Sequence, residues 1–181
     1  MKRFSIVGLV ILLILTAAYF FFTNTPDVQL SETTTESQWK SFAHCCFGNY
    51  TVEYPSDWSF DSNEIGANFS DDKEYLEYGA LAPGSYPAKL INITRYKTEQ
   101  TLDQYVAAEL QARSVPVEEI TIAGNRGALL RRTVNGSNRL SAFTKQNDSI
   151  YILEGLVKNE EDVSGFEVIF MHMVGSFKFI N

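Results

Sequence analysis

The stretch GALLRRTVNGSNRLSAFTKQNDSIYILEGLV, residues 127–157, decides the fold. It holds three runs rich in β-branched, aromatic and other apolar residues, separated by short polar pairs. The pairs Asn135-Gly136 and Asn147-Asp148 are typical of tight hairpin turns. The stretch therefore predicts an antiparallel meander with strands over residues 127–134, 139–145 and 149–157.

Two predicted helices flank this meander. Thr101-Leu102-Asp103-Gln104 has the pattern of a capping box, and the apolar stripe that follows predicts a helix ending at Arg113. A second helix is expected over residues 161–174, where acidic residues near the start suit the helix dipole. Its spacing predicts a buried face formed by Val163, Phe166, Ile169, Phe170 and Met173.

Further strands are expected before the meander. The alternating run Tyr50–Tyr54 stops at Pro55, as a strand should. Additional runs predict strands over residues 76–81, 89–96 and 117–122, the last ending at the turn Ala123-Gly124-Asn125. Strands interrupted by helices in this order favour the α+β class, an antiparallel β-sheet covered by helices.

An apolar segment near the N-terminus predicts a membrane anchor. Phe4–Phe22 is uncharged and follows Lys2 and Arg3 directly. As a helix it spans roughly 28 Å, close to the ~30 Å hydrocarbon core of a bilayer. Because basic residues stay on the cytoplasmic side, we expect residues 1–3 to be a cytoplasmic stub and the rest to be extracytoplasmic. The predicted protein is thus single-pass in the cell membrane.

The alternative to an anchor is a cleaved signal peptide, for which Thr16-Ala17-Ala18 would be the cleavage site. After the apolar segment, residues 23–41 are mostly polar and predict a flexible linker. A recognition peptide or a glycosylated stalk is the alternative for that segment. Residues 42–181 have the length of one domain with its own core.

The charge balance limits the choice of partner. All 22 acidic residues but only 13 of the 15 basic residues follow the anchor, so this part carries a formal charge of 13 minus 22, or −9. Binding to phosphate backbones needs a basic surface, so nucleic acid is not expected as a ligand. An acidic surface suits a cationic partner or serves solubility.

His44-Cys45-Cys46 is the most unusual short string. Adjacent cysteines bridge poorly, because trans Cα atoms lie about 3.8 Å apart and disulfides prefer about 4.4–6.8 Å. A strained vicinal disulfide, an intermolecular bridge and reduced thiols all stay open. The string is a weak metal candidate, since it lacks C-x-x-C spacing and only His172 adds another soft ligand. We therefore expect no metal and no cofactor, and no nucleophile motif marks a catalytic residue.

Two charged stretches invite functional hypotheses. Residues 61–77 hold six acids and one lysine, which predicts a solvated loop, with calcium binding as the alternative. Arg126, Arg131, Arg132 and Arg139 form the only basic cluster. Arg131 and Arg132 must face opposite sides of a strand. The hypothesis is that Arg126, Arg139 and one of that pair flank a turn and contact an acidic partner or lipid headgroup.

The order of these elements resembles a known family. The resemblance rests on four features in this order: Tyr50-x-x-x-Tyr54-Pro55-x-x-Trp58, the helix at 101–113, Val117-x-x-Ile120-x-Ile122-Ala123-Gly124, and Ser176-Phe177-x-Phe179. This order resembles the PsbP-like α-β-α sandwich, a family that includes LpqN-type bacterial lipoproteins. The resemblance implies binding or assembly roles more than catalysis. It carries no ligand site to this chain, because no binding motif matches residue by residue.

The sequence thus predicts a membrane-tethered extracytoplasmic binding or assembly module without catalytic activity. It would dock on a membrane-protein complex or envelope component, with a protein partner in or near the membrane and with the lipid bilayer contacted through the N-terminal helix. The alternatives are a small-ligand-binding or hydrolytic envelope domain, and a redox or metal protein using Cys45-Cys46. The candidate partner contacts are Tyr75, Tyr78, Tyr86, Arg126 and Arg139.

Overall fold

A computed structural model describes residues 38–44, 48–78, 88–110, 115–134, 136–158 and 162–180 of the chain. The strands are β1 Trp39–His44, β2 Tyr50–Pro55, β3 Ser59–Ser62, β4 Gly66–Ser70, β5 Lys89–Lys97, β6 Val117–Ile122, β7 Asn125–Val134, β8 Ser137–Gln146, β9 Ser149–Val157 and β10 Lys178–Phe179. The helices are α2 Lys73–Tyr78, α3 Leu102–Leu110 and α4 Val163–Ser176.

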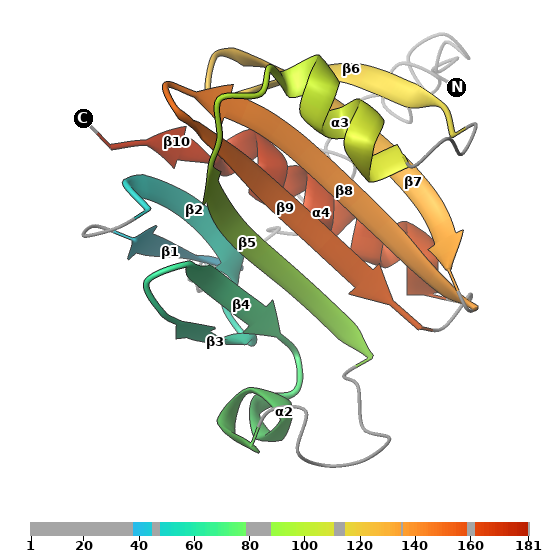
Figure 1. Ribbon diagram of the computed structural model, residues 1–181. Coiled ribbons are helices and arrows are strands. Elements are labelled where there is room, and N and C mark those ends of the chain that lie inside the picture. The colour runs from blue at the N-terminus through green and yellow to red at the C-terminus, as the bar shows by residue number, and fades with distance from the viewer. Residues whose placement is uncertain are drawn as a thin grey trace, which may run out of the picture. The chain divides into compact units, whose positions relative to one another are not determined.

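Two antiparallel sheets form the framework (Figure 1). Among the described residues, the larger has seven strands in the order β3-β4-β5-β9-β8-β7-β6, and the smaller has the order β1-β2-β10. All neighbouring strands pair antiparallel. The predicted meander is confirmed as β7, β8 and β9, which lie side by side in sequence order.

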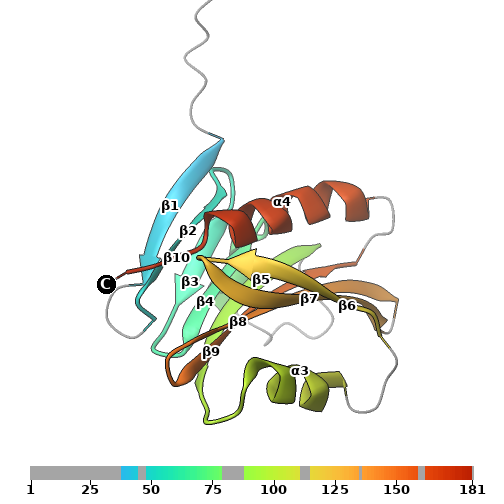
Figure 2. The ribbon, with the colours of Figure 1, turned by 90° about the horizontal axis from the view of Figure 1, so that it is seen from above.

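The elements stack in three layers (Figure 2). Helix α4 and the smaller sheet lie on one face of the large sheet, and α3 lies on the other. The main core lies between the large sheet and the layer formed by α4 and the smaller sheet. Phe69, Leu153, Phe166 and Phe170 are fully buried there. A smaller cluster lies beneath α3 and consists of Leu102, Val106, Ala128, Leu130 and Phe143. The α+β prediction of an antiparallel sheet covered by helices is thus confirmed.

Helix α4 reaches the sheet over Gly155 of β9. A Cβ atom at that glycine would lie 2.7 Å from Cδ2 of Phe170 and 2.9 Å from Cε1 of Phe166. Both rings are fully buried, so neither can move aside. The missing side chain therefore sets how closely α4 packs on the strand.

Two sequence predictions for the N-terminal half of the domain are wrong. Residues 76–78 were expected to begin a strand, but they belong to α2. The Asp72 carboxylate accepts the Tyr75 N–H at 3.1 Å, which is a helix N-terminal contact that favours the helix over the strand. Trp39–Ser41 were expected in the linker, but they pair with β2 as the first half of β1.

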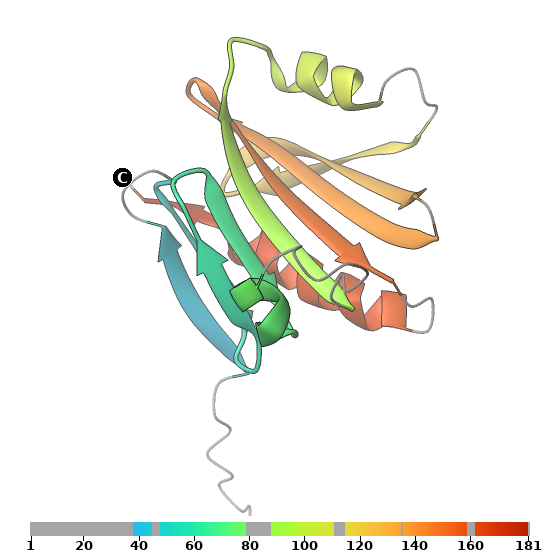
Figure 3. The same cartoon turned by 60° about the horizontal axis from the view of Figure 1, so that its bottom comes forward.

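The acidic stretch also differs from a simple loop. Its first part forms the β3–β4 hairpin, in which Ala67 and Phe69 of β4 are fully buried. Figure 3 shows α2 beside β3 and β4, remote from α3. The alternation of Ala67 and Phe69 was the signal for β4, and the acidic residues between the elements obscured it.

The expected anchor at 4–22, the linker up to residue 37, and Cys45 and Cys46 lie outside the described residues. Within the described part, none of the helices combines the length and the apolar character that a membrane crossing requires.

We expect Gly155→Ala to destabilise the domain by about 1–3 kcal/mol, because the added methyl group overpacks against two immobile rings. Gly175→Ala on α4 is the matched control, since a Cβ there meets no atom within 4 Å. The control should be neutral or stabilise the helix by up to about 1 kcal/mol. Urea unfolding of both variants measures the difference, and equal stabilities would contradict this account of α4 packing.

Candidate functional site

A groove runs between α3 and the β6–β7 hairpin. Its volume is about 370 Å³. Its apolar part contains Leu102, Val106, Leu110, Val117 and Ala128, and Asp103, Glu119 and Arg126 supply charged groups. Val117 stays 47% exposed on β6. The groove therefore combines an accessible apolar surface with a charged boundary.

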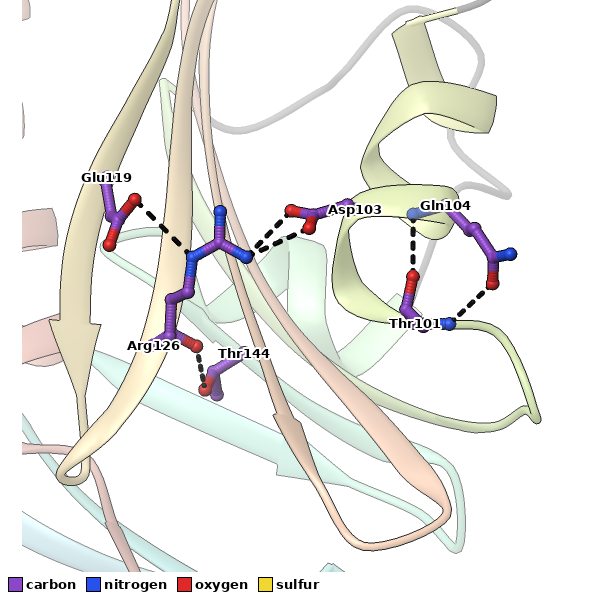
Figure 4. Close-up of polar contacts among 6 residues, drawn as sticks. All are labelled: Thr101, Asp103, Gln104, Glu119, Arg126 and Thr144. Atoms are coloured by element: carbon purple, nitrogen blue, oxygen red, sulfur yellow. Dashed lines mark hydrogen bonds and ion pairs between the residues drawn. The ribbon is translucent and has the colours of Figure 1, made fainter.

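Helix α3 begins at the capping box that the sequence predicted (Figure 4). The Thr101 hydroxyl accepts the Gln104 N–H at 3.2 Å, and the Gln104 side-chain oxygen accepts the Thr101 N–H at 2.9 Å. Leu102 and Val106 then point into the cluster beneath the helix. The cap and these two apolar side chains place α3 over the sheet.

The opposite wall of the groove is the β6–β7 hairpin, whose turn has two residues. Ile122 pairs with Asn125, and the two residues between them have positive φ, 50° at Ala123 and 79° at Gly124. Positive φ at both positions is the signature of a type I′ turn. The Thr144 hydroxyl of β8 donates to the backbone oxygen of Arg126 at 3.2 Å (Figure 4). The turn and this bond set the position of β6 at the groove.

Arg126 joins the two walls (Figure 4). Its guanidinium contacts the Asp103 carboxylate of α3 at 2.9 Å and the Glu119 carboxylate of β6 at 3.4 Å. The hydrogen bond to Asp103, with the negative charge of both carboxylates, raises the pKa of Arg126 above its ordinary value. One cation thus faces two carboxylates, and this cluster has a formal charge of −1.

A similar cluster lies on the other face of β6. Arg131 contacts Glu118 of β6 and lies 2.8 Å from the Glu167 carboxylate of α4. The hydrogen bonds to these two carboxylates raise the pKa of Arg131. This cluster also has a formal charge of −1. Adjacent Glu118 and Glu119 thus belong to acidic clusters on opposite faces of one strand.

The structure does not bring the predicted arginine cluster together. Arg132 faces away from Arg131, as predicted, and lies 3.9 Å from Glu154. Arg139 pairs with Arg132 in the sheet register and lies 3.4 Å from Glu154. Arg126 sits six residues from Arg132 along β7, roughly 20 Å at strand rise. Arg126 and Arg139 therefore lie on the same α3 side of the sheet but too far apart to form one patch.

Arg139 lines a smaller pocket on the α3 side of the sheet, with a volume of about 250 Å³. Its other polar lining residues are Asn92, Thr94, Tyr96, Tyr105, Glu109 and Glu154. Burial, together with the charge of Glu109, raises the pKa of Tyr105. Polar groups from a helix and three strands converge there.

Of the remaining contact candidates, Tyr75 and the backbone of Tyr78 belong to α2. Tyr75 is on that helix and half-buried, and Tyr86 and the side chain of Tyr78 lie outside the described residues. A groove of about 690 Å³ between α2 and β3 is lined by Tyr54, Trp58, Phe60, Asp61, Lys73, Leu76 and Glu77, together with Ser59. Tyr75 is absent from that lining.

The two histidines have structural contacts. The buried His44 accepts the Gly48 N–H on Nδ1 at 2.9 Å, so its Nε2 donates to the Asn63 carbonyl at 2.8 Å. A metal at His44 would have to displace one of these bonds. His172 stacks on Trp39 with ring centroids 3.6 Å apart and contacts Glu53 at 2.9 Å. Within the part of the chain that the structure describes, no group of three or more His, Cys, Asp or Glu is placed to hold a metal.

No protein-family model and no curated protein sequence matches the chain. Solved structures are similar to it. The PsbP protein CyanoP of Synechocystis sp. PCC 6803 has a TM-score of 0.53 at 12% identity, covering 78% of this chain and 92% of that one. The Ran-binding protein Mog1p of Saccharomyces cerevisiae has a TM-score of 0.51 at 12% identity, covering 79% and 96%.

LpqN of Mycobacterium tuberculosis, described as involved in cell envelope biogenesis, has a lower TM-score of 0.46 at 12% identity, covering 80% of this chain and 91% of LpqN. The similarity to CyanoP and Mog1p establishes the fold. The described domain has the PsbP-like fold, as the sequence resemblance indicated.

We expect Arg126→Gln to loosen α3 from the hairpin, because Asp103 and Glu119 then face each other without the bridging cation. Amide hydrogen exchange within residues 102–110 should become faster. Lys178→Gln, on the exposed part of β10, is the control and should leave that exchange unchanged. Unchanged exchange in the Arg126 variant would show that the ion pairs do not restrain α3.

Proposed function

We propose that the chain is a membrane-tethered extracytoplasmic docking module. In this proposal residues 4–22 anchor it with the N-terminus in the cytoplasm, and the linker spaces the domain from the bilayer. The domain binds a protein of a membrane complex or of the envelope, without chemistry of its own. The observation that carries the proposal is the groove between α3 and the β6–β7 hairpin.

The composition of the groove suits a protein partner. Protein interfaces combine an apolar centre with a polar rim. Here Leu110 and Val117 provide accessible apolar surface, and the Asp103–Arg126–Glu119 cluster lies at the boundary. These charged side chains are more than half exposed, so a partner can reach them.

The fold supports the same proposal in a general way. Mog1p, which is similar to this chain in structure, is a Ran-binding protein, so a domain of this shape can present a protein-binding surface. The acidic character of the extracytoplasmic part adds a preference for a cationic partner.

A second candidate function is the binding of a small polar ligand. The pocket beside Arg139 favours it, because Asn92, Tyr105 and Glu154 converge there from different elements. Its volume of about 250 Å³ is slightly below the usual ~300–1,000 Å³ of ligand sites. Docking at the larger apolar groove therefore has the stronger support.

Site-specific photo-crosslinking in intact cells tests the docking proposal. We expect a benzophenone amino acid at position 107 or 117, which both line the groove, to capture the same protein. The control is position 65 between β3 and β4, toward the edge of the large sheet opposite β6, where Ile65 is 59% exposed. Position 65 should not capture that protein. Equal capture from all three positions, or no capture from 107 and 117, would count against docking at this groove.

The tether has its own test. We expect the full chain to remain in the membrane pellet after alkaline carbonate extraction, because a spanning apolar helix resists that treatment. A chain lacking residues 4–22 should be released and serves as the control. Release of the full-length chain, or an N-terminus that starts after Ala18, would favour the cleaved signal peptide.

A further inference from the structure

Strand β6 lies at an edge of the large sheet. Among the described residues it pairs with β7 and with no strand on its outer side. The type I′ turn makes Ile122 and Asn125 a hydrogen-bonded pair, and such pairs alternate along an antiparallel ladder. The backbone groups of Ile122, Ile120 and Glu118 therefore point toward β7. Those of Thr121, Glu119 and Val117 point outward.

These outward groups form a template for another strand. An exposed edge can accept an extended peptide by main-chain hydrogen bonds, and alternate side chains of that peptide then face the two sides of the sheet. On the α3 side they would meet the groove at Val117 and the Glu119 cluster. On the α4 side they would meet the Glu118 cluster.

Charge defines what the added strand must carry. The Asp103–Arg126–Glu119 and Glu118–Arg131–Glu167 clusters lie on opposite faces of β6, and each has two carboxylates for one guanidinium. A strand beside β6 therefore meets excess negative charge on both of its faces. Cationic side chains match both clusters, whereas acidic ones would be repelled.

We propose that β6 receives an extended basic segment of the partner polypeptide by strand addition. The segment places an apolar residue opposite Val117 and cationic residues opposite Glu118 and Glu119, which are three consecutive positions. This inference rests on the proposed docking function and names the chemistry of the partner. Main-chain bonds to β6 supply affinity, and the three side chains supply selectivity.

A purely protective role for the acidic edge is the competing interpretation. Charged residues on edge strands also prevent sheets from joining each other. The two interpretations differ in their consequences. A protective edge forms no bond with a partner backbone, and its neutralisation leads to pairing between copies of the chain.

The backbone requirement is tested in the full-length chain in membranes, with the photo-crosslinker at position 107. Thr121→Pro removes one outward N–H and no charge, and edge strands tolerate proline. We expect it to lower the capture of the partner at least tenfold, whereas Thr121→Val should keep the capture within twofold. Thermal unfolding checks that both variants fold. Should the Thr121→Pro variant unfold, Val117→Pro at the first strand residue takes its place.

The charge requirement is tested separately with Glu118→Gln and Glu119→Gln. Each should lower capture severalfold, and more strongly at low salt. Glu64→Gln, an exposed residue outside both clusters, is the control and should leave capture unchanged. Sequencing of the captured peptide should show consecutive cationic residues next to an apolar one.

The results separate the two proposals. Equal capture by the proline and valine variants would overturn strand addition while leaving docking intact. If neither glutamate substitution changes the capture of the partner, or if the captured peptide is acidic, the proposal that the segment is basic would be overturned. A crosslinked dimer of this chain as the sole product would overturn it in favour of self-association. Failure to capture any protein from positions 107 and 117 would overturn the docking function and this inference together.

Discussion

The close approach of α4 to the sheet at Gly155 is the contact on which the arrangement of the domain depends. Phe166 and Phe170 lie where a side chain on β9 would otherwise stand. Trp58, which follows β2, stacks on Phe166 with ring centroids 6.5 Å apart. The smaller sheet therefore packs beside α4 and shares its core. That layer occupies one face of the large sheet, which leaves the other face to α3.

Helix α3 is short, and this limit creates the groove. Its nine residues cover β7 and β8 through Leu102 and Val106, and they leave much of the edge strand β6 exposed. The edge strand β6 then runs beside the helix with a gap between them, and Arg126 crosses that gap. Among the described residues, the groove thus arises from the size difference between a seven-stranded sheet and helix α3 on this face.

Local patterns predicted most of the fold. The capping box at Thr101, the apolar alternation of Tyr50–Tyr54 and the turn at Asn147-Asp148 depend on near neighbours, and each is found in the structure. The strand predicted to begin at residue 76 was wrong because the helix cap at Asp72 outweighed the strand-like composition of residues 76–78. Trp39 was missed because its pairing partner, Pro55, is distant in sequence.

The site was less accessible to prediction than the fold. Arg126 was singled out, but its acidic partners come from α3 and β6, and nothing in the local sequence joins Asp103 to Glu119. The sequence suggested that Arg126, Arg139 and one of Arg131 and Arg132 share a basic surface, because no acid lies near them in sequence. In the fold, two carboxylates contact Arg126 and two contact Arg131, so each of these clusters has a formal charge of −1. Arg132 and Arg139 share the single carboxylate of Glu154.

The position of β1 has a mechanical consequence. Its first residue, Trp39, stacks on His172 of α4, and His172 contacts Glu53 of β2. Any pull that reaches the domain through the preceding chain enters at this point. The ring stack and the antiparallel ladder with β2 resist that pull first, while the groove lies on the opposite face of the large sheet. Tension on the preceding chain and binding in the groove would therefore act on separate layers of the same domain.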